Sequence, residues 1–242
     1  MFHGRTIRQY NYMIFRHIAS SFGAALVVGT TVLGTTVLGT AVTSTVTASA
    51  AACPDVEVVF ARGTGEPPGL GGTGEAFVND LRSKVGNKTV DVYPVDYPAS
   101  IDFPTAVDGI NDAANHIQAT AAKCPKTKMV LGGFSQGAAV MGFVTSNAVP
   151  PGATDYVGNG PMAPEVAKHV AAVTLFGKPS PAFMGLIGQP AVTIGPLYSG
   201  KTLDSCVPGD PICSSGGDGA LHNQYIPDGL VDQAAAYAAS RV

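Results

Sequence analysis

Short runs of β-branched and other apolar residues alternate along the chain with longer segments in which apolar residues recur at helical spacing. The short runs predict strands over 56–60, 89–93, 128–132 and 170–176. The helical spacing predicts a helix capped at Thr73 and stopping at Gly86, and others over 104–124, over 136–147 and from about 228 onward. The Gly- and Pro-rich segment 179–201 is left unassigned. This order predicts an α/β fold of three layers, in which helices flank a mainly parallel central sheet on both faces.

The N-terminal segment has the layout of a secretory signal. It carries Arg5, Arg8 and Arg16 without any acidic residue, followed by an apolar run over 24–46 and the small residues Ala48-Ser49-Ala50. We therefore expect residues 1–50 to be removed and 51–242 to form a single secreted domain. The apolar run is long enough that a retained membrane anchor is the alternative.

Removing this segment makes the chain more acidic. Three arginines and no acids are lost, so the formal net charge falls from −3 to about −6. An acidic domain is a poor partner for nucleic acid, and no second apolar run of membrane length follows. We expect a monomer that has no stable membrane span after cleavage.

All four cysteines lie in the exported part, which predicts two disulfides formed in an oxidising compartment. The short separation of Cys206 and Cys213 favours a local bridge, and this leaves Cys53 to pair with Cys124. The alternative of a zinc site lacks close Cys-x-x-Cys spacing, and the histidines of this part form no cluster. We therefore expect no metal. A lipidated Cys53 is a further alternative, but the preceding Ala-Ala-Ala lacks a larger aliphatic residue.

The sequence Gly133-Phe134-Ser135-Gln136-Gly137 lies between a predicted strand and a predicted helix. A strand, a sharp turn at serine and a helix form a nucleophile elbow, in which flanking glycines leave room for a strained backbone. Because Gly and Ser are common in this chain, the alternative is an ordinary glycine turn.

A nucleophilic serine needs a base and an orienting carboxylate, which follow it in the order Asp, His in folds with this elbow. Two histidines follow Ser135: His169 beside a predicted strand and His222 in a late loop, which suits a base. Asp204, Asp210 and Asp218 are the candidate acids. A Cys206–Cys213 bridge would restrain the loop around Asp210, and the alternative is a surface Gly-Asp-Pro turn.

Five motifs, in order along the chain, resemble the cutinase family, and most closely the cutinase-like serine esterases of actinobacteria. They are Cys53, Ala61-Arg62-Gly63-Thr64, Gly133 to Gly137, Cys206-Val207-Pro208-Gly209-Asp210-Pro211-Ile212-Cys213 and Leu221-His222. The resemblance implies a small secreted α/β-hydrolase that cleaves carboxylic esters through an acyl-enzyme without a cofactor.

The resemblance also implies a role for each motif residue. Ser135 would be the nucleophile, His222 the general base and acid, and Asp210 the orienting carboxylate. The backbone N–H groups of Thr64 and Gln136 would form the oxyanion hole. The implied substrates are esters of short to medium acyl chains, including lipid or cutin-type polyesters. The alternatives are an acetyl esterase acting on polysaccharide and a non-catalytic secreted binding protein with a retired site.

Overall fold

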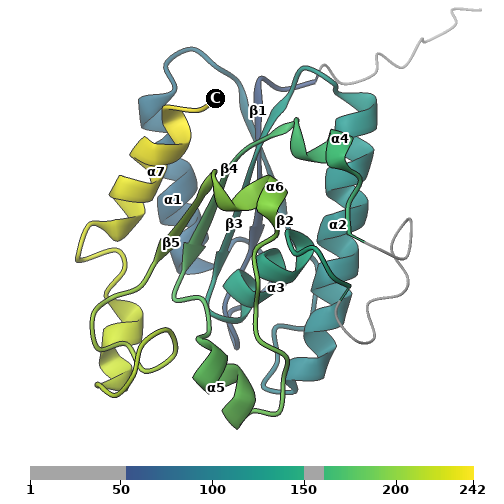
Figure 1. Cartoon of the computed structure of the whole chain (residues 1–242). Helices are drawn as coiled ribbons and strands as arrows, with labels where there is room; N and C mark the ends of the chain where they lie inside the picture. Colours follow the sequence, from purple (N-terminus) through teal and green to yellow (C-terminus); the bar gives the residue numbers. More distant parts are fainter. Residues whose placement is uncertain (1–52, 150–160) are drawn as a thin grey trace, which may run out of the picture. The chain divides into compact units, whose positions relative to one another are not determined.

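A computed structural model describes residues 53–149 and 161–242, which form a parallel sheet between two layers of helices (Figure 1). The sheet has the strand order β2-β1-β3-β4-β5, and every neighbouring pair is parallel. Its strands are β1 (Val56–Ala61), β2 (Val90–Pro94), β3 (Lys128–Phe134), β4 (Val170–Phe176) and β5 (Thr202–Ser205). The predicted α/β class and the four predicted strands are confirmed. The predicted signal segment, 1–50, lies outside the described residues.

Helices cover both faces of the sheet. They are α1 (Gly71–Lys84), α2 (Ala106–Lys123), α3 (Gln136–Val144), α4 (Pro164–Ala167), α5 (Pro181–Leu186), α6 (Pro196–Ser199) and α7 (Leu230–Ala239), with 3₁₀ turns at Phe103–Thr105 and Gly219–Asn223. Figure 1 shows α1 and α7 on one face and α2 and α3 on the other. Within the two described stretches, we find no helix with the length and hydropathy needed to cross a bilayer.

The sequence of β1 shows why the sheet is covered on both sides. Successive side chains of a strand point to opposite faces, so a strand buried on both faces reads as a continuous apolar run. Val56, Val58 and Phe60 belong to the core under α1 and α7. Val59 and Ala61 belong to the core under α2 and α3. The apolar run therefore indicates that β1 is an inner strand of the sheet. This agrees with the strand order, in which β1 lies between β2 and β3.

The boundaries of two helices differ from those predicted. Helix α1 begins at Gly71, and Thr73 lies buried in its first turn instead of capping it. The carboxylate of Glu66 accepts the N–H of Gly72 at this end of the helix. Helix α3 ends at Val144 instead of Asn147, and the hydroxyl of Thr145 donates to a carbonyl of the last turn. In both cases a side-chain hydrogen bond at the helix end accompanies the shift.

The C-terminal third contains elements that the pattern did not predict. The unassigned segment 179–201 includes the short helices α5 and α6. Strand β5 was not predicted, because it has four residues, lies at the sheet edge and buries only Ser205 fully. Such a strand lacks the apolar run that marks β1 and β4.

The disulfide Cys53–Cys124 joins a residue three positions before β1 to the residue that follows α2, across 71 positions, as predicted. Closing a loop of this length stabilises the fold by about 4 kcal/mol in the chain-entropy model. We expect Cys53→Ser with Cys124→Ser to lower the melting temperature by roughly 10 °C for a domain of this size. Circular dichroism melts of the two proteins under non-reducing conditions measure this, and equal melting temperatures would contradict it.

Candidate active site

Ser135 lies in a strained turn between β3 and α3. Its backbone has φ 56° and ψ −117°, a conformation that costs a non-glycine residue of order 1–3 kcal/mol. The turn requires close backbone contact on both sides. A Cβ added to Gly133 would lie 2.2 Å from the carbonyl oxygen of Gly137, and one added to Gly137 would lie 2.0 Å from that of Ala61. The structure therefore has the strand, sharp turn and helix expected of a nucleophile elbow.

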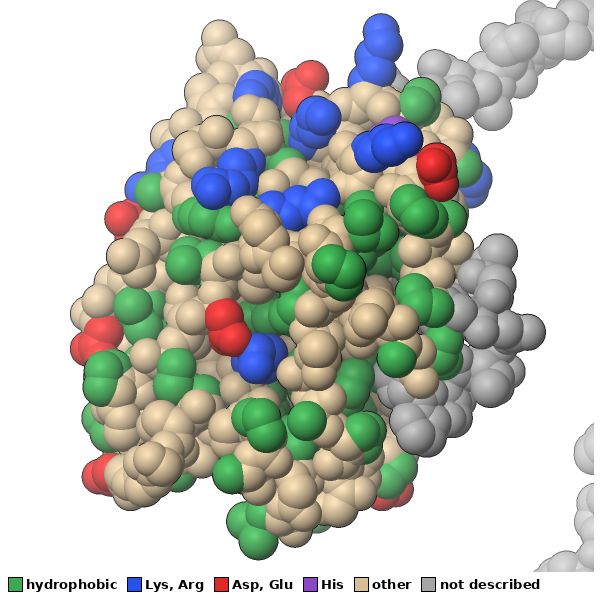
Figure 2. All heavy atoms as spheres, in the orientation of Figure 1, with side chains coloured by type: hydrophobic (Ala, Val, Ile, Leu, Met, Phe, Trp, Pro, Cys, Tyr) green, Lys and Arg blue, Asp and Glu red, His purple; other side chains and the backbone are tan. Residues whose placement is uncertain are grey.

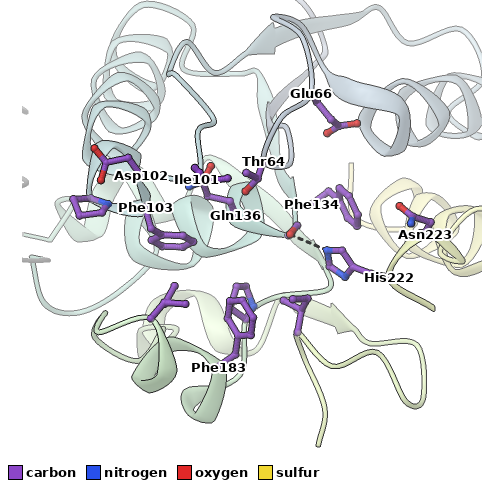
Figure 3. A pocket seen from close by; sticks show the side chains of 15 residues that line it. Thr64, Glu66, Ile101, Asp102, Phe103, Phe134, Gln136, Phe183, His222 and Asn223 are labelled. Atoms are coloured by element: carbon purple, nitrogen blue, oxygen red, sulfur yellow. Dashed lines mark hydrogen bonds between the residues drawn. The ribbon is translucent and has the colours of Figure 1, made fainter. Parts of the chain in front are cut away.

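Three side chains that the sequence singled out form a hydrogen-bonded chain. Nε2 of His222 lies 2.8 Å from Oγ of Ser135, a contact drawn in Figure 3. Nδ1 of the same ring lies 2.7 Å from Oδ2 of Asp210. Asp210 is fully buried, whereas Ser135 and His222 line a cavity. The fold thus connects a serine at the end of β3 with two residues of the C-terminal loops.

The other candidate residues have different partners. Oδ2 of Asp204 lies 3.2 Å from Nζ of Lys178. The carboxylate of Asp218 accepts the N–H of Ala220 at 2.9 Å and caps a 3₁₀ turn. His169 directly precedes β4 and so lies at the end of the sheet formed by the N-termini of the strands. Ser135 follows the end of β3, so the parallel sheet separates the two histidine candidates by the length of a strand.

Three donors and a disulfide surround Asp210. Its Oδ1 accepts the N–H of Ile212 at 2.9 Å, and its Oδ2 accepts the hydroxyl of Tyr225 at 2.6 Å in addition to the His222 ring. The predicted disulfide Cys206–Cys213 closes the loop that carries the carboxylate. Burial raises the pKa of Asp210, but the hydrogen bonds from Tyr225, His222 and Ile212 outweigh it and hold the pKa below its ordinary value. The carboxylate is therefore ionised at neutral pH.

Tyr225, which contacts Asp210, was not predicted from the sequence. Burial, followed by its hydrogen bond to Asp210, raises the pKa of its hydroxyl well above the ordinary value, so the hydroxyl remains a donor. Its ring packs edge-on against Phe134 and Phe176 at 5.7 and 6.2 Å between centroids. The residue follows His222 by three positions, and that proximity is the one signal in the sequence that could have indicated it.

The cavity beside Ser135 has a volume of about 560 Å³ and mostly apolar walls (Figure 3). The apolar residues that line it are Ile101, Phe103, Pro104, Phe134, Pro179, Phe183, Ile187 and Ile212. Thr64 and Gln136 line it as well. Their backbone N–H groups find no acceptor among the described residues. Two free donors beside a serine hydroxyl can stabilise an oxyanion.

The charged residues are distributed unevenly. Figure 2 shows lysine and arginine side chains gathered at one end of the visible face, which is the end where the strands of Figure 1 begin. The described residues that line the cavity include no lysine or arginine, but they include Glu66 and Asp102. The cavity therefore offers an apolar surface with carboxylates and without a cation.

The hydrogen bond from Tyr225 to Asp210 can be tested by removing the hydroxyl. We expect Tyr225→Phe to destabilise the fold by about 2 kcal/mol at pH 7, because a hydrogen bond to a buried charged group is lost. Tyr198→Phe is a matched control, since the Tyr198 hydroxyl is buried without a hydrogen-bond partner among the described residues. Thermal melts of both variants measure the difference, and equal effects of the two substitutions would contradict the expectation.

The destabilisation should depend on pH. The Tyr225 hydroxyl favours the ionised carboxylate and lowers the pKa of Asp210 in the folded state. Its contribution is complete above the unfolded value of about 4 and is lost as the pH falls through the lower folded value. The gap between the melting temperatures of wild type and Tyr225→Phe should therefore narrow from pH 7 to pH 3. A gap that widens on acidification would show that the hydroxyl does not stabilise the ionised form.

This chain is similar to several known proteins. The family model described as Cutinase matches residues 52–242. The chain is 62% identical over 168 residues to the probable carboxylesterase Culp5 of Mycobacterium tuberculosis, a match covering 69% of this chain and 96% of that protein. It is 48% identical over 195 residues to the phospholipase Culp4 of the same organism, covering 80% and 81%.

A solved structure, the Trichoderma reesei cutinase in complex with a C11Y4 phosphonate inhibitor, matches with a TM-score of 0.58 and 35% identity, covering 78% of this chain and 76% of that one. The two sheets share the α/β-hydrolase arrangement. From the family model, the identities and the fold together, the chain belongs to the cutinase family of carboxylic ester hydrolases.

Proposed function

We propose that this protein is a secreted serine esterase that hydrolyses carboxylic esters of short to medium acyl chains, lipid esters among them. One observation carries the proposal: Ser135, His222 and Asp210 form an unbroken hydrogen-bonded chain at an apolar cavity. This is the arrangement by which a serine hydroxyl is activated for attack on an acyl carbon.

The first half-reaction forms an acyl-enzyme. Oγ of Ser135 attacks the ester carbonyl carbon while Nε2 of His222 takes the hydroxyl proton. The carbonyl electron pair moves to its oxygen, and the N–H groups of Thr64 and Gln136 bind the resulting oxyanion. When the tetrahedral intermediate collapses, the bond to the alcohol oxygen breaks and His222 returns the proton to that oxygen. The alcohol leaves and the acyl group remains on Ser135.

The second half-reaction repeats these steps with water. His222 takes a proton from water as its oxygen attacks the acyl carbon, and it then protonates Oγ of Ser135 as the carboxylic acid leaves. Asp210 accepts the Nδ1–H of His222 throughout. It thereby fixes the ring orientation and stabilises the imidazolium that forms in each half-reaction.

The lining of the cavity supports an uncharged, apolar acyl ester as substrate. Phe103, Phe183 and Ile187 offer a surface for an acyl chain, and Ile101 beside them is 95% exposed. Glu66 and Asp102 would repel an anionic group near the ester. A relative named as a phospholipase supports lipid esters within this class. An acetylated polysaccharide would instead present hydroxyl groups to apolar walls and bury them without partners.

The two disulfides and the basic-then-apolar N-terminal sequence support export, with 1–50 as the signal and 51–242 as the mature, monomeric domain. N-terminal sequencing of the protein recovered from culture medium, with its mass in solution, tests this proposal. A chain that stays with the cells and begins at Met1 would indicate a retained anchor instead.

We expect Ser135→Ala to lower kcat for p-nitrophenyl butyrate by about 10³-fold or more, because the attacking atom is lost. It should also abolish labelling by a fluorophosphonate probe while the circular dichroism spectrum stays unchanged. Ser146→Ala is the control, since Ser146 lies beyond the other end of α3 and is expected to keep full activity. Turnover near the wild-type value in Ser135→Ala would refute the nucleophile assignment.

A substrate panel separates the ester classes. We would compare p-nitrophenyl esters from acetate to laurate, a phosphatidylcholine with short acyl chains and acetylated xylan, all with wild type and Ser135→Ala. The proposal expects the highest kcat/KM for butyrate to octanoate esters. Preference for acetylated xylan would favour the polysaccharide deacetylase, and labelling without turnover of any ester would favour a binding protein.

The loop that carries Asp210 should affect turnover more than stability. The Cys206–Cys213 bridge spans 7 positions, and the chain-entropy model gives about 2.5 kcal/mol for so short a loop. A misaimed carboxylate leaves His222 badly oriented, so Cys206→Ser with Cys213→Ser should lower kcat about tenfold or more at temperatures where the protein is folded. Cys53→Ser with Cys124→Ser is the control and should keep kcat. Equal kcat in the two double variants would contradict the role given to this loop.

A further inference from the structure

The oxyanion loop, residues Arg62 to Leu70, joins β1 to α1 and carries Thr64. The carboxylate of Glu66 connects its two ends. Oε2 accepts the N–H of Gly63 at 2.6 Å, and Oε1 accepts the N–H of Gly72 at 2.8 Å. Since Gly72 lies in the first turn of α1, the positive end of the helix dipole also favours the carboxylate. One side chain thus fixes the loop to a helix packed on the sheet.

The surrounding chain leaves space for this carboxylate and for little else. Gly71 has φ +69°, and a Cβ there would lie 2.3 Å from Oε2 of Glu66. On the other side, a Cβ on Gly63 would lie 3.2 Å from the same oxygen and 2.8 Å from the ring of Phe134. The carboxylate is therefore fitted between the start of the loop and the start of α1.

Arg62 fixes the same loop from its buried side. Arg62 is 3% exposed, and its guanidinium donates to the carbonyls of Glu66, Val95 and Tyr97, the last at 2.6 Å. The hydroxyl of Tyr97 donates in turn to the Arg62 carbonyl. No carboxylate within the described residues forms an ion pair with Arg62 at 4.0 Å or less. Glu66 is thus held through both its backbone and its side chain.

We propose that Glu66 is a positioning residue that acts through Thr64, an inference that rests on the proposed esterase function. Glu66 accepts the N–H of Gly63. The next residue, Thr64, lines the cavity, and its backbone N–H has no acceptor within the described residues. The carboxylate thereby fixes the direction of the Thr64 N–H before substrate binds. Such preorganisation is what makes an oxyanion hole effective.

A carboxylate near the oxyanion also has an opposite effect, because it repels the negative charge that develops there. The two effects predict opposite results when Glu66 is replaced. If repulsion prevails, a neutral side chain raises kcat. If positioning prevails, a neutral side chain lowers kcat, and a residue that cannot accept either N–H lowers it most.

The experiment compares Glu66→Gln, Glu66→Ala and the control Glu75→Gln, which removes one charge from an exposed position of α1. Active sites are titrated with a p-nitrophenyl phosphonate, so that kcat refers to active molecules. We expect Glu66→Ala to lower kcat by about 10- to 100-fold, with KM changed by less than about threefold. Glu66→Gln should fall between the two, because its amide oxygen can accept one N–H but its nitrogen cannot accept the other. Glu75→Gln should match wild type.

A second measurement separates positioning from a loss of fold. A trifluoromethyl ketone forms a tetrahedral adduct whose oxyanion occupies the same hole. We expect its Ki to rise in each Glu66 variant by the factor by which kcat/KM falls. A purely structural role would lower the melting temperature and the titrated fraction, while the remaining active molecules kept the wild-type Ki.

Unchanged or increased kcat in both Glu66 variants, or an unchanged Ki, would overturn the inference. If Glu66→Ala does not fold, Glu66→Gln decides alone by the same criteria. Failure of the proposed function itself would look different, because wild type would then react with neither the phosphonate nor any ester.

Discussion

The contact of Gly137 with the carbonyl group of Ala61 determines where the site is built. It brings the end of β1 against the start of α3 and leaves no room for a side chain between them. Ser135 therefore lies at the end of the sheet formed by the C-termini of the parallel strands. Thr64, in the turn after β1, and Gln136, the first residue of α3, both line the cavity. The two free N–H groups of the cavity come from these two segments.

Two carboxylates then give the loops their shape. Asp210 accepts from Ile212, Tyr225 and His222, and Glu66 accepts from the N–H groups of Gly63 and Gly72. Neither residue lies on a strand or a helix. Loops are less rigid than the elements they connect, and these hydrogen bonds compensate by tying each loop to a helix or to a buried aromatic side chain. The precision of the site comes from charge-assisted hydrogen bonds as much as from the sheet.

The sequence predicted what depends on pattern and spacing. Strands β1 and β4 are buried on both faces and read as apolar runs, whereas the edge strand β5 has no such run. Ser135 was indicated by its flanking glycines, and Asp210 by the two cysteines around it. Glu66 and Tyr225 were missed, because a single glutamate or tyrosine in a loop has no periodicity. Their partners are set by the path of the loop in three dimensions, which local sequence does not encode.

The order of the residues along the chain has a consequence for biosynthesis. The elbow and both free N–H groups are complete once α3 has been made, but Asp210 and His222 come from the segment between β5 and α7. A ribosome makes the chain from its N-terminus. In the proposed mechanism, the serine is therefore without its base during synthesis until the segment between β5 and α7 has been made. The proposed reactivity of Ser135 thus depends on the part of the chain that is made last.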